Sequence, residues 1–445
     1  MDAEQFYARL FSQNERIMKF GLEAIGKALM REAPVTYPHI LVAGTNGKGQ
    51  VSALFANAVH ALGYQTGLFT SPHLVAFRER IRINGRMLLE ENIIRIGNDV
   101  LTEYGGTEMP GYSGIALTYF ECCLVIALRA FAQHHIQFGV FEVGLGGRLD
   151  ATNALAPGLS IITSISRDHE AYLGHETAQI AREKAGIMRR GCPVICGRQE
   201  IETLRAEAIA RGCSSFDALD DTFGLVRRNG AIMLDTGREL IRLTGAEDMP
   251  GYQQDNLAVA VFALLKAAEC GLISGDLRGI LDGLAARTRW VGRMWTCRAD
   301  AAQKLGVRKV MLDGAHNPDG VHAFVSAVSQ RADNGTPKAL VVNSCGDKAL
   351  EDMFPLYLAV FDPSAIFVVP ISATKRAMAP ADYCRRTGLS EAQACHSLAE
   401  GLSKAAKCAG SDGIIYISGS LYLLGEAIQA LGETEMLDTI DNITA

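Results

Sequence analysis

The chain has 445 residues, of which 48% are hydrophobic and 21% charged, with a net charge of −6 and a pI near 6.0. A chain of this length favours two domains over one. The net negative charge argues against a general nucleic-acid binder or a partner of anionic membranes, because the phosphate groups of both would repel it.

Eleven cysteines are scattered along the chain without a C-x-x-C pair, which favours reduced thiols. The first twenty residues are polar and of mixed charge, and they lack the apolar region of a secretion signal. No uncharged apolar run reaches the length of a transmembrane helix. We therefore expect a cytoplasmic α/β protein.

The first clear pattern is a strand, a loop and a helix. Residues 39–44 form an apolar run that ends in glycine, which indicates a buried strand. Apolar residues then recur at helical spacing from Val51 to Leu62, and Gly63 suits the end of that helix. Residues 64–69 are the next expected strand. So short a crossover implies parallel strands with a right-handed connection.

The alternation of strands and helices continues along the chain and predicts an open, mainly parallel sheet covered on both faces. The expected helices are 117–135 and 178–190, and the expected strands are 138–144, 159–165 and 192–197. A polar, basic stretch near Thr288 precedes a new series of strands, at 308–314, 339–344, 365–370 and 413–419. We predict an N-terminal P-loop-type domain with a mainly parallel sheet over residues 1–287, and a smaller Rossmann-like α/β domain over residues 288–445.

Residues 42–51, VAGTNGKGQV, have the composition of a phosphate-binding loop. Glycines surround Lys48 where the predicted strand gives way to the helix, so backbone N–H groups and the helix N-terminus face an anion. Lys48 adds a positive charge. The strict Walker A pattern fails, because Val42 stands where that pattern has glycine. The alternative is a glycine-rich turn with a solvated lysine.

Nine segments in order resemble the Mur ligase superfamily, and among its members the folylpolyglutamate synthase and dihydrofolate synthase family. They span nearly the whole chain. The segments are GTNGKG (44–49), GLFTSPHLVAFRERIRING (67–85), LTYFE (117–121), FEVGLGGRLDATN (141–153), SRDHEAYLG (166–174), IAREKAGI (180–187), WVGR (290–293), LDGAHNP (312–318) and SGSLYLLGE (418–426).

The resemblance implies ATP-driven amide formation through an acyl phosphate, with a divalent cation at the phosphates. It implies Ser71, Glu142 and His169 as the metal ligands, and two oxygen donors with one imidazole suit Mg²⁺ or Mn²⁺ better than zinc. Glu142 is expected in the middle of an apolar strand, a costly place for a carboxylate without a cation nearby. Alternatively, Glu142 is a surface acid at a strand end and His169 an ordinary loop histidine.

The resemblance also implies an ATP site between the two domains, so that domain closure assembles it. The implied ATP-binding residues are Thr45, Asn46, Gly47, Lys48, Gly49, Gln50, Asn256, Arg293 and Asp313. The implied catalytic residues are Lys48, Lys184 and His316. Lys184 matches a lysine that carries a carbamate in relatives, which requires a neutral amine and so a lowered pKa. Alternatively, Lys184 is a solvated helix residue and Asp313 caps a helix.

For the substrates, the resemblance implies L-glutamate together with dihydropteroate or reduced folates, and a monomeric enzyme. Phe120 is expected to stack on a pterin ring, and Asp150 to bind its amino-pyrimidine edge beside Ala151. Phe120 is equally compatible with a place in the core.

The chain departs from the family pattern at several positions. Gln50 replaces the Ser or Thr of the loop, Val291 a proline, Trp295 an acid and Tyr252 a histidine, and residues 346–349 lack a second aspartate. Three alternatives therefore stay open: a Mur-type ligase acting on another carboxylate, a non-catalytic nucleotide-binding relative and, least favoured, a dinucleotide-binding oxidoreductase.

Overall fold

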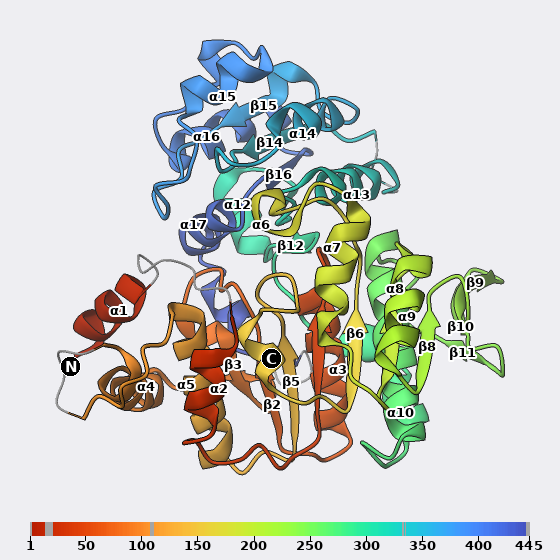
Figure 1. Cartoon of the computed structure of the whole chain (residues 1–445). Coiled ribbons are helices and arrows are strands. Elements are labelled where there is room, and N and C mark those ends of the chain that lie inside the picture. Colours follow the sequence, from red (N-terminus) through yellow and green to blue (C-terminus); the bar gives the residue numbers. More distant parts are fainter. Residues whose placement is uncertain (1, 14–20, 107–110, 332, 334, 442–445) are drawn as a thin grey trace.

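An eight-stranded sheet forms the centre of the first lobe in the computed structural model, which describes residues 2–441 except 14–20, 107–110, 332 and 334 (Figure 1). The strand order is β4-β3-β2-β5-β1-β6-β7-β8, and only the pairs β2–β3 and β3–β4 are antiparallel. The strands are β1 (His39–Ala43), β2 (Thr66–Phe69), β3 (Ile81–Ile83), β4 (Arg86–Met87), β5 (Phe138–Glu142), β6 (Leu159–Ile162), β7 (Pro193–Cys196) and β8 (Ser215–Ala218).

The central strand β1 is buried along its whole length. Ile40 and Val42 join the core that contains α3 (Lys48–Ala61) and α9 (Gly251–Glu269), whereas Leu41 and Ala43 join the core that contains α5 (Tyr119–Gln133). Helices therefore cover both faces of the sheet, and this explains why the strand is a continuous apolar run instead of an alternating one.

The other helices of the first lobe surround this sheet, and a small antiparallel sheet of order β11-β10-β9 lies at its β8 end (Figure 1). These helices are α1 (Ala3–Ser12), α2 (Glu23–Leu29), α4 (Glu90–Tyr104), α6 (Glu170–Leu173), α7 (Thr177–Lys184), α8 (Ile201–Arg211), α10 (Leu277–Leu281) and α11 (Leu284–Arg287). The small sheet consists of β9 (Gly224–Arg228), β10 (Ala231–Asp235) and β11 (Leu240–Arg242).

The second lobe has a five-stranded sheet of order β12-β13-β16-β14-β15, in which only β12 runs antiparallel to its neighbour. Its strands are β12 (Trp295–Thr296), β13 (Lys309–Leu312), β14 (Lys338–Val342), β15 (Ile366–Val368) and β16 (Ile414–Ser418). Its helices are α12 (Ala299–Leu305), α13 (Pro318–Ser329), α14 (Leu350–Tyr357), α15 (Pro380–Thr387), α16 (Leu398–Ala409) and α17 (Leu421–Leu431).

These two sheets confirm the predicted fold class, a mainly parallel α/β lobe followed by a smaller one. Two details of the prediction were wrong. The helix expected over 178–190 ends at Lys184 and gives way to a 3₁₀ turn, Ala185–Ile187. Glu142 is the last residue of β5 and not in the middle of the strand, although it is buried.

We propose the domain boundary at residue 288, between the end of α11 and the start of β12. The chain also crosses back at its other end, where the backbone N–H of Ile440 donates to the carbonyl of Gly85 at 3.0 Å and Ile440 packs into the first lobe's core. Among the helices that the structure describes, none is both long and apolar enough to span a bilayer.

Candidate active site

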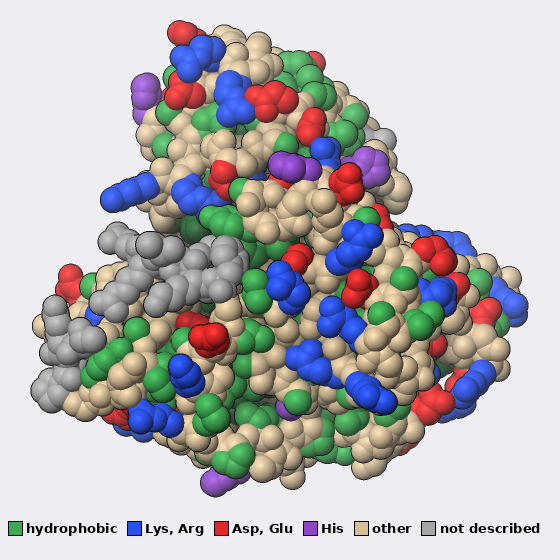
Figure 2. Space-filling model, in the orientation of Figure 1, with side chains coloured by type: hydrophobic (Ala, Val, Ile, Leu, Met, Phe, Trp, Pro, Cys, Tyr) green, Lys and Arg blue, Asp and Glu red, His purple; other side chains and the backbone are tan. Residues whose placement is uncertain are grey.

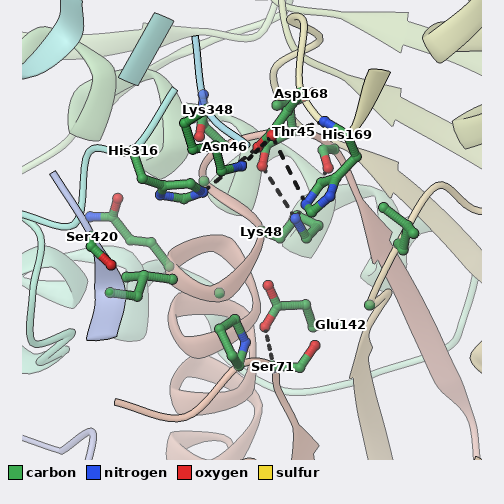
Figure 3. Close-up of a pocket in the computed structure, with 18 of the residues that line it drawn as sticks. Thr45, Asn46, Lys48, Ser71, Glu142, Asp168, His169, His316, Lys348 and Ser420 are labelled. Atoms are coloured by element: carbon green, nitrogen blue, oxygen red, sulfur yellow. Dashed lines mark hydrogen bonds and ion pairs between the residues drawn. The ribbon is translucent and has the colours of Figure 1, made fainter. Parts of the chain in front are cut away.

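A cavity of about 210 Å³ lies where the two lobes meet. The phosphate loop, residues 71–73, Glu142 and residues 168–169 line it from the first lobe. His316, Lys348, Arg376 and residues 419–422 line it from the second lobe. Figure 3 shows the labelled side chains from both lobes converging on one space. The carboxyl ends of parallel strands β1, β5 and β6 supply much of this wall, as expected for an open α/β sheet.

The phosphate loop has the conformation that its glycines predict. Gly44 has φ +146° and Gly47 has φ +89°, both within the region that favours glycine. A side chain at Gly47 would also collide with the Asn256 carboxamide. Helix α3 begins at Lys48, whose Nζ donates to the carbonyls of Gly44 and Thr45 at 3.2 Å each. The loop therefore presents a helix N-terminus and an ammonium group to the cavity.

The side chain of Gln50 points from the first turn of α3 toward helix α9. Its Oε1 accepts a hydrogen bond of 2.8 Å from Nδ2 of Asn256 on α9, and the side chain is buried. Ser52, two residues further along α3, is fully buried and its hydroxyl has no partner among the described residues. The carboxamide of Gln50 thus ties the first turn of α3 to α9.

The three expected metal ligands line the same cavity. Glu142 is 4% exposed, and its Oε2 accepts from the backbone N–H of Ser71 at 2.9 Å. Burial raises the pKa of the Glu142 carboxyl, while the charge of Lys48 acts in the opposite direction. Burial also lowers the pKa of His169 to about 4, so its imidazole is neutral at pH 7. A buried carboxylate, a neutral imidazole and a hydroxyl suit a hard divalent cation.

The described residues contain no group of three or more His, Cys, Asp or Glu side chains placed to hold a metal. The expected set agrees with this, because it contributes only Glu142 and His169 of those types, with Ser71 as the third donor. Water and phosphate oxygens complete such a site in many magnesium proteins.

Lys184, the last residue of α7, lies behind the phosphate loop. It is 3% exposed, and its Nζ donates to the carbonyl of Gly44 at 2.7 Å. Burial, and then the charge of Lys48, hold the pKa of Lys184 well below its ordinary value. The solvated alternative for Lys184 is therefore wrong, and the low pKa meets the precondition for a carbamate, which stays a prediction.

Asp313 organises the junction on the side of the second lobe. Its carboxylate accepts from the Tyr252 hydroxyl at 3.0 Å and from the backbone N–H groups of Met294 and Ala315 at 2.8 and 2.9 Å. The helix-capping alternative is wrong, since Asn317 caps α13. Burial raises the pKa of Asp313, with Arg293 opposing it. Tyr252, one of the departures from the family pattern, thus has a structural partner in Asp313.

A second cavity, of about 280 Å³, adjoins the first. Asn46, Gly47 and Arg293 line both cavities, Asn256 and Asp313 line the second, and Thr45, Lys48, Gly49 and Gln50 line the first. The expected ATP-binding residues therefore surround one continuous region, which fits an elongated ligand with a phosphate chain at one end.

The expected pterin residues lie outside both cavities. The ring of Phe120 covers Gly144 and lies 5.6 Å from the ring of Phe69. Asp150 is buried, and accepts from the N–H groups of Leu145 and Thr152 at 2.9 and 3.0 Å and from the Thr152 hydroxyl at 2.6 Å. Ala151 is buried beside it. Their substrate role stays a prediction.

Asp168 and Lys348 were not among the site residues predicted from the sequence. Lys348 Nζ donates to Oδ1 of Asp168 at 2.6 Å, across 180 residues of chain. Burial acts against ionisation of Asp168, but the hydrogen bond and charge of His316, with the charge of Lys348, hold its pKa below the ordinary value. Asp168 could have been found from its place beside His169 in the loop that follows β6, and Lys348 from residues 346–349, which were compared with the family pattern only for a missing aspartate.

A comparison with protein families matches residues 293–421 to the model described as "Mur ligase, glutamate ligase domain". Among curated proteins, the chain is 30% identical to the folylpolyglutamate synthase of Lacticaseibacillus casei, over 88% of this chain and 90% of that one. It is 31% identical to the dihydrofolate synthase/folylpolyglutamate synthase of Bacillus subtilis, over 76% and 79% of the two chains.

A solved structure of the bifunctional folylpolyglutamate synthase/dihydrofolate synthase of Yersinia pestis, complexed with AMPPNP and a Mn ion, superposes with a TM-score of 0.82. The match is 26% identical and covers 97% of this chain and 98% of that one. Two α/β lobes enclosing a phosphate loop and a buried carboxylate define a ligase of the Mur superfamily. Within it, the chain belongs to the folylpolyglutamate synthase/dihydrofolate synthase family.

Proposed function

We propose that this chain is an ATP-dependent ligase that joins L-glutamate to dihydropteroate, which makes dihydrofolate, and to reduced folates, which makes polyglutamates. Family membership supports the reaction class. The observation that carries the proposal for this chain is the convergence on one cavity of Lys48, the buried Glu142 and the second lobe's His316. A phosphate chain, a divalent cation and an acceptor carboxylate can meet there.

In the proposed reaction, a carboxylate oxygen of the pterin-bearing substrate attacks the γ-phosphorus of ATP. The bond from that phosphorus to the β,γ-bridging oxygen breaks, which leaves ADP and an acyl phosphate. The amine of glutamate then attacks the acyl phosphate, loses a proton and displaces phosphate. The N–H groups of residues 44–49 and the ammonium of Lys48 hold the phosphates and stabilise their charge. Closing the lobes excludes water, which would otherwise hydrolyse the acyl phosphate.

Ser71, Glu142 and His169 would hold a divalent cation, Mg²⁺ or Mn²⁺, which would neutralise phosphate charge when bound. Arg293 and Asn256 line the region next to the phosphate loop and would contact the nucleotide. His316 enters from the second lobe and would face the transferring phosphoryl group. Lys184 would support the loop from behind, through Gly44.

The test is to incubate the purified protein with ATP, Mg²⁺, L-glutamate and either 7,8-dihydropteroate or tetrahydrofolate, and to measure phosphate release and product mass. Product from both pterins is expected. Product from neither, with ATP still bound, would contradict the substrates and favour another carboxylate. Binding without turnover on any carboxylate would favour the non-catalytic alternative.

Lys48→Met is the matched variant for this assay. Removing the ammonium should lower kcat/KM by at least about 100-fold, the size of loss typical for a charge that stabilises a transition state. Circular dichroism should show the fold unchanged, because the hydrogen bonds that Lys48 Nζ makes within the described residues go to two backbone carbonyls of its own loop. Activity near that of the wild type would contradict the phosphate-loop assignment.

We further infer that the enzyme works as a cytoplasmic monomer without a nucleic-acid or membrane partner. All eleven cysteines are free thiols, which suits a reducing compartment. On the face shown in Figure 2, basic and acidic side chains are interspersed and do not gather into one basic patch. Light scattering coupled to gel filtration at several protein concentrations tests the monomer, and a mass above the 47.9 kDa of one chain would contradict it.

A further inference from the structure

One carboxylate of the first lobe contacts three side chains of the second. Oδ1 of Asp168 accepts from Lys348 Nζ at 2.6 Å, and Oδ2 accepts from Asn317 Nδ2 at 3.0 Å and lies 3.6 Å from His316 Nε2. The side chains of Asp168 and Lys348 are 9% and 11% exposed. A charged pair so well shielded couples strongly, because water does not screen it.

The contact extends to the phosphate loop. Asn317 and Asn46 exchange carboxamide hydrogen bonds of 3.2 Å, and Asn317 also caps α13 through the N–H of Gly320 at 2.8 Å. Within the first lobe, the Thr45 hydroxyl and the backbone of Ser166 exchange hydrogen bonds of 3.0 and 3.1 Å. The loop that carries Asp168 and the loop that holds phosphate are therefore fixed to each other and to the second lobe.

We propose that Asp168 and Lys348 form a latch that closes the second lobe onto the phosphate loop and sets His316 in place. Both are positioning residues. The inference rests on the proposed function only in that a closed cavity serves ligation. Opening the lobes would separate Lys348 from Asp168 and return both charges to water, so the pair defines two states, one closed for reaction and one open for exchange of substrates and products.

A second ion pair, between the residue before Asp168 and a residue on α14, joins the same parts of the two lobes and provides a control. Arg167 Nη2 lies 3.5 Å from Oδ2 of Asp352, but both side chains are about half exposed, at 52% and 54%. Exposed pairs of this kind contribute little because solvent screens them. The Arg167–Asp352 pair thus lies next to Asp168 in the sequence, as a control should, but it is exposed where the Asp168–Lys348 pair is buried.

The experiment compares Lys348→Met, Asp168→Asn, their double variant and the control Arg167→Met. Two readouts are used: small-angle X-ray scattering without ligands, and kcat/KM for L-glutamate. Each latch variant should show a larger radius of gyration than the wild type and a loss of more than about ten-fold in kcat/KM. The fold-loss of kcat/KM in the double variant should be no greater than that in the more impaired single variant, because the two residues act through one contact. Arg167→Met should stay within about two-fold.

An unchanged radius of gyration in Lys348→Met, or a double variant whose loss is the product of the single losses, would overturn the latch and give Lys348 an independent role. If Asp168→Asn does not fold, the comparison of Lys348→Met with Lys348→Arg decides, since arginine keeps the charge and should restore the closed shape. The scattering experiment needs no substrate, so its result stands whether or not the proposed reaction is correct.

Discussion

At the scale of single residues, Gln50 is the position at which this chain departs most clearly from a phosphate-binding loop. A serine or threonine there offers a hydroxyl to phosphate or Mg²⁺. Gln50 instead accepts from Asn256 Nδ2 at 2.8 Å, and the Asn256 carboxamide lies over Gly47. Because Gln50 holds the carboxamide of Asn256 by this hydrogen bond, we infer that it acts on the loop through that neighbour, while its predicted contact with ATP stays a prediction.

Replacing Gln50 with Ser should therefore weaken ATP binding without a loss of fold. The shorter side chain cannot reach Asn256, and one buried hydrogen bond is worth about 0.5–1.5 kcal/mol, so KM for ATP should rise about two- to ten-fold. Initial rates over a range of ATP concentrations measure it.

The control for this change is Ser52→Ala on the same helix, where the buried hydroxyl has no partner among the described residues. Its KM for ATP should match the wild type. If Gln50→Ser lowers KM, the hydroxyl itself serves as a ligand here, and the positioning role of Gln50 is wrong.

At the scale of elements, the sequence predicted those that are apolar and long. The β1 strand and the helix that follows it were found because burial on both faces leaves a continuous apolar run. The hairpin of β3 and β4 was missed because its strands have only three and two residues, and the sheet of β9 to β11 was missed because its short strands are partly exposed and carry a weak pattern. The end of α7 at Lys184 was missed as well: the chain turns into a 3₁₀ turn at Ala185, and Gly186 within that turn packs directly against the backbone of Arg148.

The start of β1 gives a prediction on pH. His39 is 6% exposed, and its Nδ1 lies 3.1 Å from the Tyr37 carbonyl. Burial lowers the pKa of His39 below its ordinary 6.5, although the hydrogen bond to Tyr37 opposes the shift. As the pH falls below 6.5, the unfolded chain takes up the proton first. The contribution of His39 to stability is therefore complete above pH 6.5 and is lost as the pH falls toward the lowered value.

His39→Asn keeps a donor for the Tyr37 carbonyl but cannot titrate in this range. Between pH 7.5 and pH 5.5, the unfolding free energy of the wild type should fall by more than that of the variant. The extra loss should be at most about 1.4 kcal/mol per pH unit. Urea unfolding at both pH values measures it. Parallel pH profiles of the two proteins would show that His39 titrates normally in the folded state.

At the scale of the whole molecule, the site could be predicted from sequence only lobe by lobe. Lys48, Glu142 and His169 lie at or after the carboxyl ends of three strands of one sheet, so the sequence could predict that they lie along the same edge of that sheet. The contact of Lys348 with Asp168 depends on how the two lobes meet, and no periodicity within either lobe encodes that geometry. Within the first lobe, the contact of Gln50 with Asn256 was not predicted either, because it depends on the packing of α3 against α9, and the two residues are 206 positions apart in the chain.

The lobes are also joined twice, because the end of the chain returns to the first lobe. Arg82, on β3 and 3% exposed, donates from Nη2 to the carbonyl of Leu437 at 2.7 Å and from Nη1 to that of Asp438 at 3.2 Å. Ile440 then donates to Gly85 and accepts from Arg289. The second lobe is thus held to the first lobe at both of its ends, which restricts how far the lobes can separate.

Arg82→Met should destabilise this arrangement by about 3 kcal/mol, because it keeps the apolar stem but removes the buried charged donor to the carbonyls of Leu437 and Asp438. The control is Arg86→Met, an exposed neighbour whose backbone bridge to Thr439 survives, with an expected change within about 0.5 kcal/mol. Urea unfolding followed by circular dichroism compares them. Equal, small changes would mean that the returning segment is held by Ile440 and its backbone bonds alone. A large loss confined to Arg82→Met, together with faster proteolysis near residue 438, would identify the arginine as the second attachment of the lobes.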